Sequence, residues 1–337
     1  MRKPFLTSDN IYISEPQTPF RADASPIAIN CNHPADARLQ ELISASLSEN
    51  TKRAYIGDLT HFLDAGGELP ASAEGVALYL SRFAGELAVS TLTRRVATLG
   101  KVHKANGWPN PCQTELVKSV MRGIQRTHGG NQHQAKPLCR ENLFLVLDTM
   151  GETRRDIRDK ALLLTGFAGG FRRSELVGLN WADVDEVREG MVISLRRSKT
   201  DQTGVGRKVG VPLGRTRHCP VRALLAWRDV SGDVGQAIFR PVDWLDRPQD
   251  NRLSGEAVPI LLRERIAAAG LDPTGFSGHS LRAGFATSAA KAGVASYKIR
   301  QQTGHKSDAM LGRYIRDGEL FEGNAAGVLL LAAGIGP

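Results

Sequence analysis

Cysteine is scarce in this sequence. Four cysteines occur among 337 residues, and they lie far apart at Cys31, Cys112, Cys139 and Cys219. Structural zinc sites and redox dithiols need closely spaced cysteine pairs, so the sequence predicts neither. We expect the four thiols to be reduced and to behave as small, buried apolar groups.

Long apolar runs are also lacking. The N-terminal sequence MRKPFLTSDN is not followed by the apolar stretch that a secretory signal requires. The only lipid-like stretch, residues 327–335, is far shorter than the roughly 20 residues needed to cross a bilayer. We therefore expect a cytoplasmic protein that makes no membrane contact.

Motifs for cofactors are missing as well. The sequence contains no P-loop, no zinc-ligand spacing and no acidic triad suited to two-metal catalysis. We expect a protein that uses neither a cofactor nor a metal ion.

Basic residues, in contrast, are in excess. Lysine and arginine total 44 against 35 acidic residues, which gives a net charge of +9 and favours a polyanionic partner, with nucleic acid as the first candidate. Between residues 86 and 128 there are seven basic residues and two acidic ones, Glu86 and Glu115. The basic ones are Arg94, Arg95, Lys101, Lys104, Lys118, Arg122 and Arg126. Any one of them can be an ordinary solvated surface residue, but a cluster on neighbouring helices is better explained by phosphate contacts.

The length of the chain allows two domains, each with its own core. Residues 1–33 lack periodicity and are expected to form a flexible arm, and the glycine-rich and polar residues 129–138 are expected to form a linker. Residues 34–128 are predicted to form a small helical domain, with helices at 36–47, 51–65, 72–85, 90–106 and 113–127.

The second domain, residues 139–337, is predicted to be mixed. Strands are expected at 191–196 and 207–213. Helices are expected at 140–150, 155–169, 220–229, 254–269, 279–291, 295–302, 308–316 and 319–332. The predicted fold class is therefore mainly α with a small β-sheet.

Several short motifs in the second domain carry groups that could react. GGFRRSEL places Arg172 and Glu175 three residues apart, and RRSKTD puts Lys199 in a turn between strands. GHSLRAG contains His279 and Arg282, and TGHKSDAMLGRY contains His305 and Tyr314. Each motif alone is more often structural: an ion pair on a helix, a solvated lysine, a core tyrosine.

Taken together, in the order Arg, Lys, His-x-x-Arg, His, Tyr, these motifs resemble the tyrosine recombinase (lambda-integrase) family, and within it the Cre-like members. The resemblance covers roughly residues 34–330. It is strongest from SGHSLRAG to RYIRDGEL and clear in DIRDKALLLTGFAGGFRRSELVGL. It is weaker in SENTKRAY and AVSTLTRRVATLGKVHKANGWP, which look like the family's core-binding domain.

The resemblance implies a fold and an activity. The fold would be a two-domain clamp around DNA, made of a helical, SAM-like core-binding domain and a mixed α+β catalytic domain. The activity would be site-specific recombination of double-stranded DNA at inverted-repeat sites, in a synaptic homotetramer. Strands would be cut and rejoined through a 3′-phosphotyrosyl intermediate, without metal or ATP.

The roles of the site residues follow from this chemistry. Arg172 and Arg282 would clamp the charge that develops on the phosphate oxygens. Phenols have a reference pKa of about 10, so Tyr314 needs a base or a positive site to act as nucleophile, and His279 is the candidate for that proton transfer.

Three further residues would support the reaction. Lys199 would protonate the leaving 5′ oxygen as general acid. His305 would donate a hydrogen bond to the scissile phosphate, and Glu175 would orient the site. Ala283 stands where most members of the family have a histidine, which the Cre-like members also lack. His305 matches the wider family and departs from the Cre-like members, which have tryptophan there.

The resemblance also assigns DNA-contacting positions. Arg94 and Arg95 correspond to side chains that enter the major groove, and Arg53 lies beside another such position. Glu256 stands where a family member has a base-reading arginine, so a carboxylate here would prefer the amino group of cytosine. The full set of DNA-binding candidates is Thr51, Lys52, Arg53, Arg94, Arg95, Lys101, Lys104 and Glu256.

Two other functions and one structural alternative stay open on the sequence. A type IB topoisomerase shares the tyrosine chemistry but acts as a monomer, and a DNA-binding accessory protein would carry an inactive site. The apolar C-terminal stretch GVLLLAAGIG is expected to bury itself either in its own domain or, as an oligomerisation helix, on a neighbouring subunit.

Overall fold

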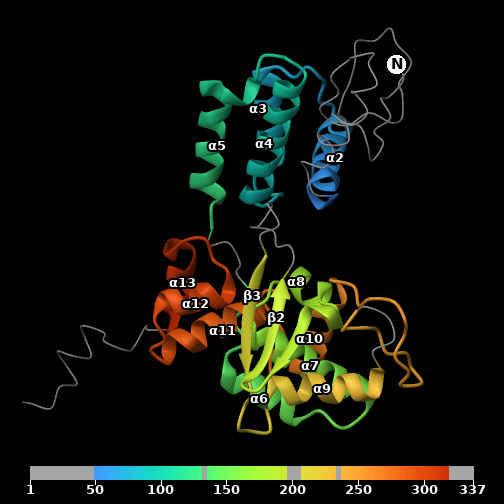
Figure 1. Ribbon diagram of the computed structural model, residues 1–337. Helices are drawn as coiled ribbons and strands as arrows, with labels where there is room; N and C mark the ends of the chain where they lie inside the picture. Colours follow the sequence, from blue (N-terminus) through green and yellow to red (C-terminus); the bar gives the residue numbers. More distant parts are fainter. Residues whose placement is uncertain (1–48, 131–134, 196–205, 233–236, 319–337) are drawn as a thin grey trace, which may run out of the picture. The chain divides into compact units, whose positions relative to one another are not determined.

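The computed structural model describes residues 49–130, 135–195, 206–232 and 237–318 (Figure 1). The chain forms two compact units, divided between residues 132 and 133. The predicted arm at 1–33, the helices at 36–47 and 319–332, and Lys199 all lie outside the described residues. None of the helices in the described part is long and apolar enough to span a bilayer.

The first unit is helical. Its elements are α2 (Glu49–Asp64), α3 (Ala73–Arg82), α4 (Val89–Ala105), the short 3-10 helix η1 (Pro111–Gln113) and α5 (Glu115–His128). Ser72 begins α3 by accepting a hydrogen bond from the backbone N–H of Gly75 at 3.0 Å. Leucines at helical spacing, such as Leu92 and Leu99 of α4, fill the core together with Phe62 of α2.

The second unit combines helices with a small sheet. Helices α6 (Arg140–Asp148), α7 (Arg154–Ala168) and α8 (Arg173–Gly178) come first, followed by η2 (Trp181–Asp183). Strands β1 (Val184–Val187), β2 (Gly190–Leu195) and β3 (Arg207–Pro212) form an antiparallel sheet in that order. The remaining helices are α9 (Pro220–Ser231), α10 (Ala257–Ala268), α11 (Ser280–Lys291), α12 (Ser296–Thr303) and α13 (Asp308–Gly318).

The predicted fold class is confirmed, because the described residues are mainly helical with one three-stranded sheet. The sequence predicted only β2 and β3. Strand β1 was missed because its four residues, VDEV, are mostly exposed at the edge of the sheet and show no apolar alternation.

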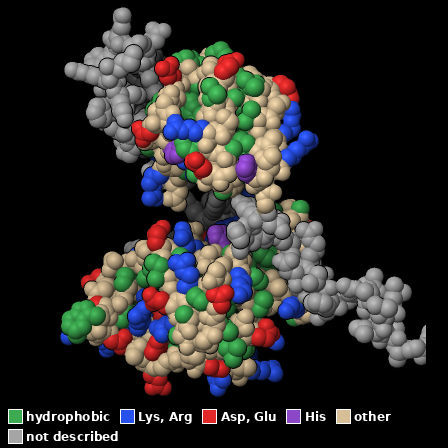
Figure 2. Space-filling model, turned by 180° about the vertical axis from the view of Figure 1, so that it is seen from behind, with side chains coloured by type: hydrophobic (Ala, Val, Ile, Leu, Met, Phe, Trp, Pro, Cys, Tyr) green, Lys and Arg blue, Asp and Glu red, His purple; other side chains and the backbone are tan. Residues whose placement is uncertain are grey.

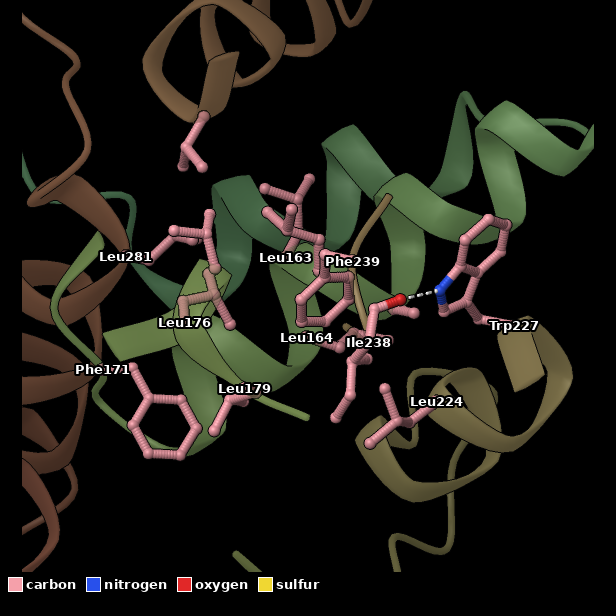
Figure 3. Packing of buried hydrophobic residues seen from close by; sticks show 14 of the residues in the cluster. Leu163, Leu164, Phe171, Leu176, Leu179, Leu224, Trp227, Ile238, Phe239 and Leu281 are labelled. Atoms are coloured by element: carbon pink, nitrogen blue, oxygen red, sulfur yellow. Dashed lines mark hydrogen bonds between the residues drawn. The ribbon is translucent and has the colours of Figure 1, made fainter. Parts of the chain in front are cut away.

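Apolar packing positions the elements that carry the predicted motifs. In Figure 3, Leu176 of α8 and Leu281 of α11 lie near each other in the core of the second unit. A Cβ added to Gly166 of α7 would lie 2.8 Å from both leucine side chains, so the three helices meet at this point. Phe171, 1% exposed, anchors the turn between α7 and α8. This packing fixes the residues that flank it, Glu175 and Arg282 among them.

Candidate active site

Arg172 stands at the N-terminus of α8, directly after the turn that ends α7. Its backbone N–H donates to Oε2 of Glu175 at 2.9 Å, and its side-chain Nη1 donates to Oε1 of the same carboxylate at 2.6 Å. The Glu175 side chain is 2% exposed. The pair is therefore both a helix cap and a buried ion pair, and it holds the guanidinium in one orientation.

Arg207, at the start of β3, is a second partner of the same carboxylate. Its Nη2 lies 3.2 Å from Oε2 of Glu175, and its Nη1 donates to the carbonyl oxygen of Gln302 in α12. It passes close to Gly304, where a Cβ would lie 3.0 Å from Arg207 Nε. Gly304 also has φ +69, in the left-handed region that favours glycine at a helix C-terminus. The sequence motifs did not single out Arg207.

Arg282 projects from α11 into the same region and is 4% exposed. Its Nη1 donates to the carbonyl oxygen of Gly170 at 2.8 Å and to that of Thr303. Its Nη2 is buried and has no hydrogen-bond partner among the described residues. Burial, followed by the positive charge of Arg172, lowers the pKa of Arg282 to about 10.

His305 follows α12 and is 9% exposed. Its Nδ1 lies 2.7 Å from Oγ1 of Thr303. Burial, followed by the positive charges of Arg282, Arg172 and Arg207, lowers the pKa of His305 to about 3. The imidazole is therefore neutral at pH 7.

Tyr314 lies beside this histidine. It comes from α13, its ring centroid is 5.9 Å from that of His305, and it packs against a small cluster that includes Ala286, Ile299 and Leu311. The phenol is partly exposed. Four predicted residues, Arg172, Arg282, His305 and Tyr314, are thus brought to one place with Glu175.

The charges at this place do not balance. Arg172, Arg207 and Arg282, which we call the arginine cluster, carry three positive charges, and Glu175 carries the one carboxylate in contact with them among the described side chains. A buried surplus of two positive charges is unfavourable unless an anion joins it. The unpartnered Nη2 of Arg282 marks where such an anion would be bound.

The other two residues predicted to be catalytic are His279 and Lys199. His279 is exposed and directly precedes α11. Its backbone N–H donates to Oγ of Ser277 at 3.2 Å. Lys199 belongs to residues 196–205, which connect β2 to β3 and lie outside the described residues.

The DNA-contact candidates of the first unit fall into two groups. Arg53, Lys101 and Lys104 are exposed, and the side chain of Arg94 is 49% exposed while it pairs with Asp58 at 2.8 Å. Thr51 is half-buried.

Lys52 and Arg95, in contrast, are only 9% exposed. Arg95 donates to Oη of Tyr79 at 2.6 Å, because it falls on the apolar face of α4 together with Leu92 and Leu99. The guanidinium of Arg95 is therefore bound inside the first unit.

In the second unit, Glu256 is exposed just before α10. Its side chain is 79% exposed and lies 3.8 Å from that of Arg173, the neighbour of Arg172. On the face shown in Figure 2, basic side chains are interspersed with acidic ones over each unit. In the described part of the chain, no group of histidine, cysteine and acidic residues is arranged to hold a metal ion.

Comparison with known proteins identifies the family. Residues 138–319 match the phage integrase family. An integrase/recombinase xerD homolog from Selenomonas ruminantium is 36% identical over 307 residues, covering 88% of this chain and 90% of that protein. The chain belongs to the phage integrase family. As a member, it is a site-specific tyrosine recombinase.

Other relatives agree with this placement. The recombinase cre of Escherichia phage P1 is 29% identical over 268 residues, covering 74% of this recombinase and 77% of that one. Among solved structures, XerH bound to palindromic difH substrate has a TM-score of 0.62 at 16% identity, covering 88% and 83% of the two chains. A lambda integrase tetramer bound to a Holliday junction has a TM-score of 0.58 at 18% identity, covering 84% and 76%. These two structures share the fold.

Proposed function

We propose that this recombinase cuts and rejoins DNA strands by attack of Tyr314 on a phosphodiester, through a 3′-phosphotyrosyl intermediate. The observation that carries the proposal is the arginine cluster: a buried surplus of positive charge, with an unpartnered donor on Arg282, beside a partly exposed phenol. A phosphodiester carries one negative charge and gains a second as the attacking oxygen bonds to phosphorus. The surplus of two positive charges therefore complements the transition state better than the ground state.

In the proposed step, the phenol of Tyr314 gives up its proton to a base of the site, and its oxygen forms a bond to phosphorus. The bond from phosphorus to the 5′ oxygen breaks. Arg172 and Arg282 hold the non-bridging oxygens with charged hydrogen bonds. Lys199 supplies the proton that the 5′ oxygen takes up. Glu175 orients the clamp through its contacts with Arg172 and Arg207.

The phosphotyrosyl ester keeps the energy of the broken bond. The 5′ hydroxyl of a partner strand can attack it and reverse the step, so rejoining requires no ATP. The arginine cluster supplies the positive charge for which many other nucleases use metal ions, so we propose that the reaction is also independent of metal.

The proposed partner is double-stranded DNA with inverted-repeat sites, bound in the cytoplasm. Support comes from the exposed basic residues Arg94, Lys101 and Lys104 on α4. Arg53, Thr51 and Glu256 complete the set of proposed contacts. We further propose that four copies assemble on two sites, as the lambda integrase tetramer does on a Holliday junction, and that the C-terminal stretch links neighbouring copies.

The test begins with the target site. DNA that becomes covalently attached to the protein in EDTA without ATP is purified under denaturing conditions and sequenced. Two copies of the site are then placed on one supercoiled plasmid. The proposal predicts recombinant circles from the wild type and none from Tyr314→Phe, which removes one oxygen and no charge.

Other outcomes contradict the proposal. Relaxation of a supercoiled circle without recombinants would identify a type IB topoisomerase. Binding without any covalent complex would identify an accessory protein. Cleavage that stops in EDTA and returns with magnesium would overturn the metal-free step.

A further inference from the structure

Thr303 makes two hydrogen bonds through one hydroxyl group. Its Oγ1 lies 2.7 Å from the carbonyl oxygen of Ile299 and 2.7 Å from Nδ1 of His305. A carbonyl oxygen can only accept, and two oxygens do not approach to this distance without a hydrogen between them. The hydroxyl therefore donates its single hydrogen to the carbonyl oxygen of Ile299, and Oγ1 accepts a hydrogen bond from Nδ1 of His305.

This contact fixes the tautomer of His305. The ring carries its hydrogen on Nδ1, and because the imidazole is neutral, Nε2 keeps an unshared electron pair. A neutral ring of this tautomer cannot donate from Nε2. The expectation that His305 donates a hydrogen bond to the phosphate therefore requires that it first gain a proton.

We propose that His305 is the base that takes the proton of Tyr314, and that Thr303 is the positioning residue that keeps Nε2 free to accept it. The proposal rests on the proposed function and deepens it. The O–H bond of Tyr314 breaks and its proton goes to Nε2, while the phenol oxygen bonds to phosphorus and the 5′ oxygen leaves. The imidazolium that results then donates from Nε2 to a non-bridging oxygen.

The surroundings of His305 make the transfer depend on DNA. Among the described residues, the charged and titratable groups near His305 are Arg282 of α11, Arg172 before α8, Arg207 of β3 and Tyr314 of α13, and Glu175 of α8 pairs with Arg172 and Arg207. Without DNA, burial and the three guanidinium groups lower the pKa of His305 and hold the ring neutral. A bound phosphodiester offsets their charge and makes the ring more basic, so the proton moves only when a substrate is in place.

The structure favours His305 over His279 for this role. The ring of His305 is 9% exposed and stands 5.9 Å from that of Tyr314, measured between centroids. His279 lies at the exposed residue that precedes α11, where water competes for protons. A base that is shielded from water is better placed for the transfer.

The first experiment separates a base from a hydrogen-bond donor. In His305→Gln, the side-chain amide can donate toward the phosphate but cannot take a proton. The full-length variants are mixed with target DNA whose 5′ bridging oxygen is replaced by sulfur, so that the leaving group needs no proton. The proposal predicts that covalent adduct forms at least about 100-fold more slowly at pH 7 in the variant, with DNA affinity near that of the wild type.

The pH profile provides a second readout. Without a base, the rate of His305→Gln should rise about tenfold per pH unit from pH 7 to 9, because only the small phenolate fraction reacts. The wild-type rate should change far less over this range, since its base is already unprotonated. A His305→Gln rate within about threefold of the wild type would overturn the proposal. Absence of adduct in the wild type would overturn the proposed function itself.

The second experiment tests Thr303. Thr303→Val keeps the shape but removes the acceptor, and the backbone carbonyl that binds Arg282 is retained. We expect a loss of at least about tenfold in the same assay, with Thr303→Ser restoring most of the rate. Thr165→Val, at another buried helical threonine whose hydroxyl has no partner in the described residues, is the matched control and should keep the wild-type rate.

The tautomer can be observed without any reaction. Full-length protein labelled with ¹⁵N-histidine is examined by NMR in the absence of DNA, and the His305 signals are assigned by their loss in His305→Gln. The proposal predicts a protonated, pyrrole-type Nδ1 and an unprotonated, pyridine-type Nε2, and a loss of that preference in Thr303→Val. A protonated Nε2 in the wild type would overturn it.

Discussion

Glu175 holds Arg172 at two points, because one carboxylate oxygen accepts from the backbone N–H at 2.9 Å and the other from the guanidinium at 2.6 Å. A residue held at both its backbone and its side chain loses little further freedom when it binds a ligand. The arginine is therefore oriented before DNA arrives, which is how a site stabilises a charged transition state without reorganising.

Removing the charge of Glu175 should destabilise the protein. In Glu175→Gln, three guanidinium groups remain beside a neutral amide, and loss of one partner of a buried ion pair lowers the free energy of unfolding by about 3 kcal/mol. Denaturant unfolding measures the loss. Target DNA should stabilise this variant more than the wild type, because a phosphate replaces the missing charge. Glu256→Gln, at a 79% exposed side chain, is the control and should change the free energy by less than about 0.5 kcal/mol.

Arg207 should matter for the reaction more than for DNA binding. Arg207→Gln breaks the links from β3 to Glu175 and to Gln302, three residues before His305. We expect the free energy of unfolding to fall by about 2 kcal/mol and adduct formation to slow by about tenfold or more, with similar affinity for DNA. Lys208→Gln, the exposed neighbour on the same strand, should behave like the wild type. Equal losses in both variants would point to a general effect of charge.

Lys199 should act only on the leaving group. Lys199→Ala is expected to cut normal DNA very slowly but to cut DNA with a 5′ bridging sulfur at a rate near that of the wild type, since a thiolate leaves without a proton. Adduct formation on the two substrates is measured in parallel. Equal defects on both would argue for phosphate binding instead of proton donation.

The C-terminal stretch should serve assembly. Deletion from Gly323 onward is expected to leave a protein that binds one half-site but loses cooperative occupancy of the full site and recombination. Burying three leucines and a valine at about 1.5 to 3 kcal/mol each is ample to drive association. Gel-shift titration on half sites and on full sites measures the cooperativity of DNA binding. An unfolded truncated protein would place the stretch in its own core, and normal recombination would exclude docking on a neighbour.

The order of motifs in the sequence predicted most of the candidate site. Arg172, Glu175, Arg282, His305 and Tyr314 were all singled out, although their spacing along the chain does not show how they meet. Arg207 was missed because a basic residue at the start of a strand is usually solvated. A signal was available: strand alternation puts Arg207 on the same side as Val209 and Val211, which are buried.

Two further features of the structure were not predicted from the sequence. Arg95 was grouped with its basic neighbours, although it stands three residues after Leu92 and four before Leu99, on the apolar face of a helix. The tautomer of His305 could not be predicted from the sequence, because it depends on how the last turn of α12 directs the Thr303 hydroxyl. Local patterns predict which residues take part, whereas contacts between distant elements decide what each one does.

The central claim is that Tyr314 is the nucleophile of this site, and mapping the adduct tests it most directly. Wild-type protein is reacted with target DNA in EDTA, the DNA is digested to a short remnant, and tryptic peptides are analysed by mass spectrometry. We predict the nucleotide mass on the peptide that contains Tyr314, and no adduct in Tyr314→Phe. Nucleotide attached to Tyr297, which is 61% exposed on α12, or to any other residue would contradict the account.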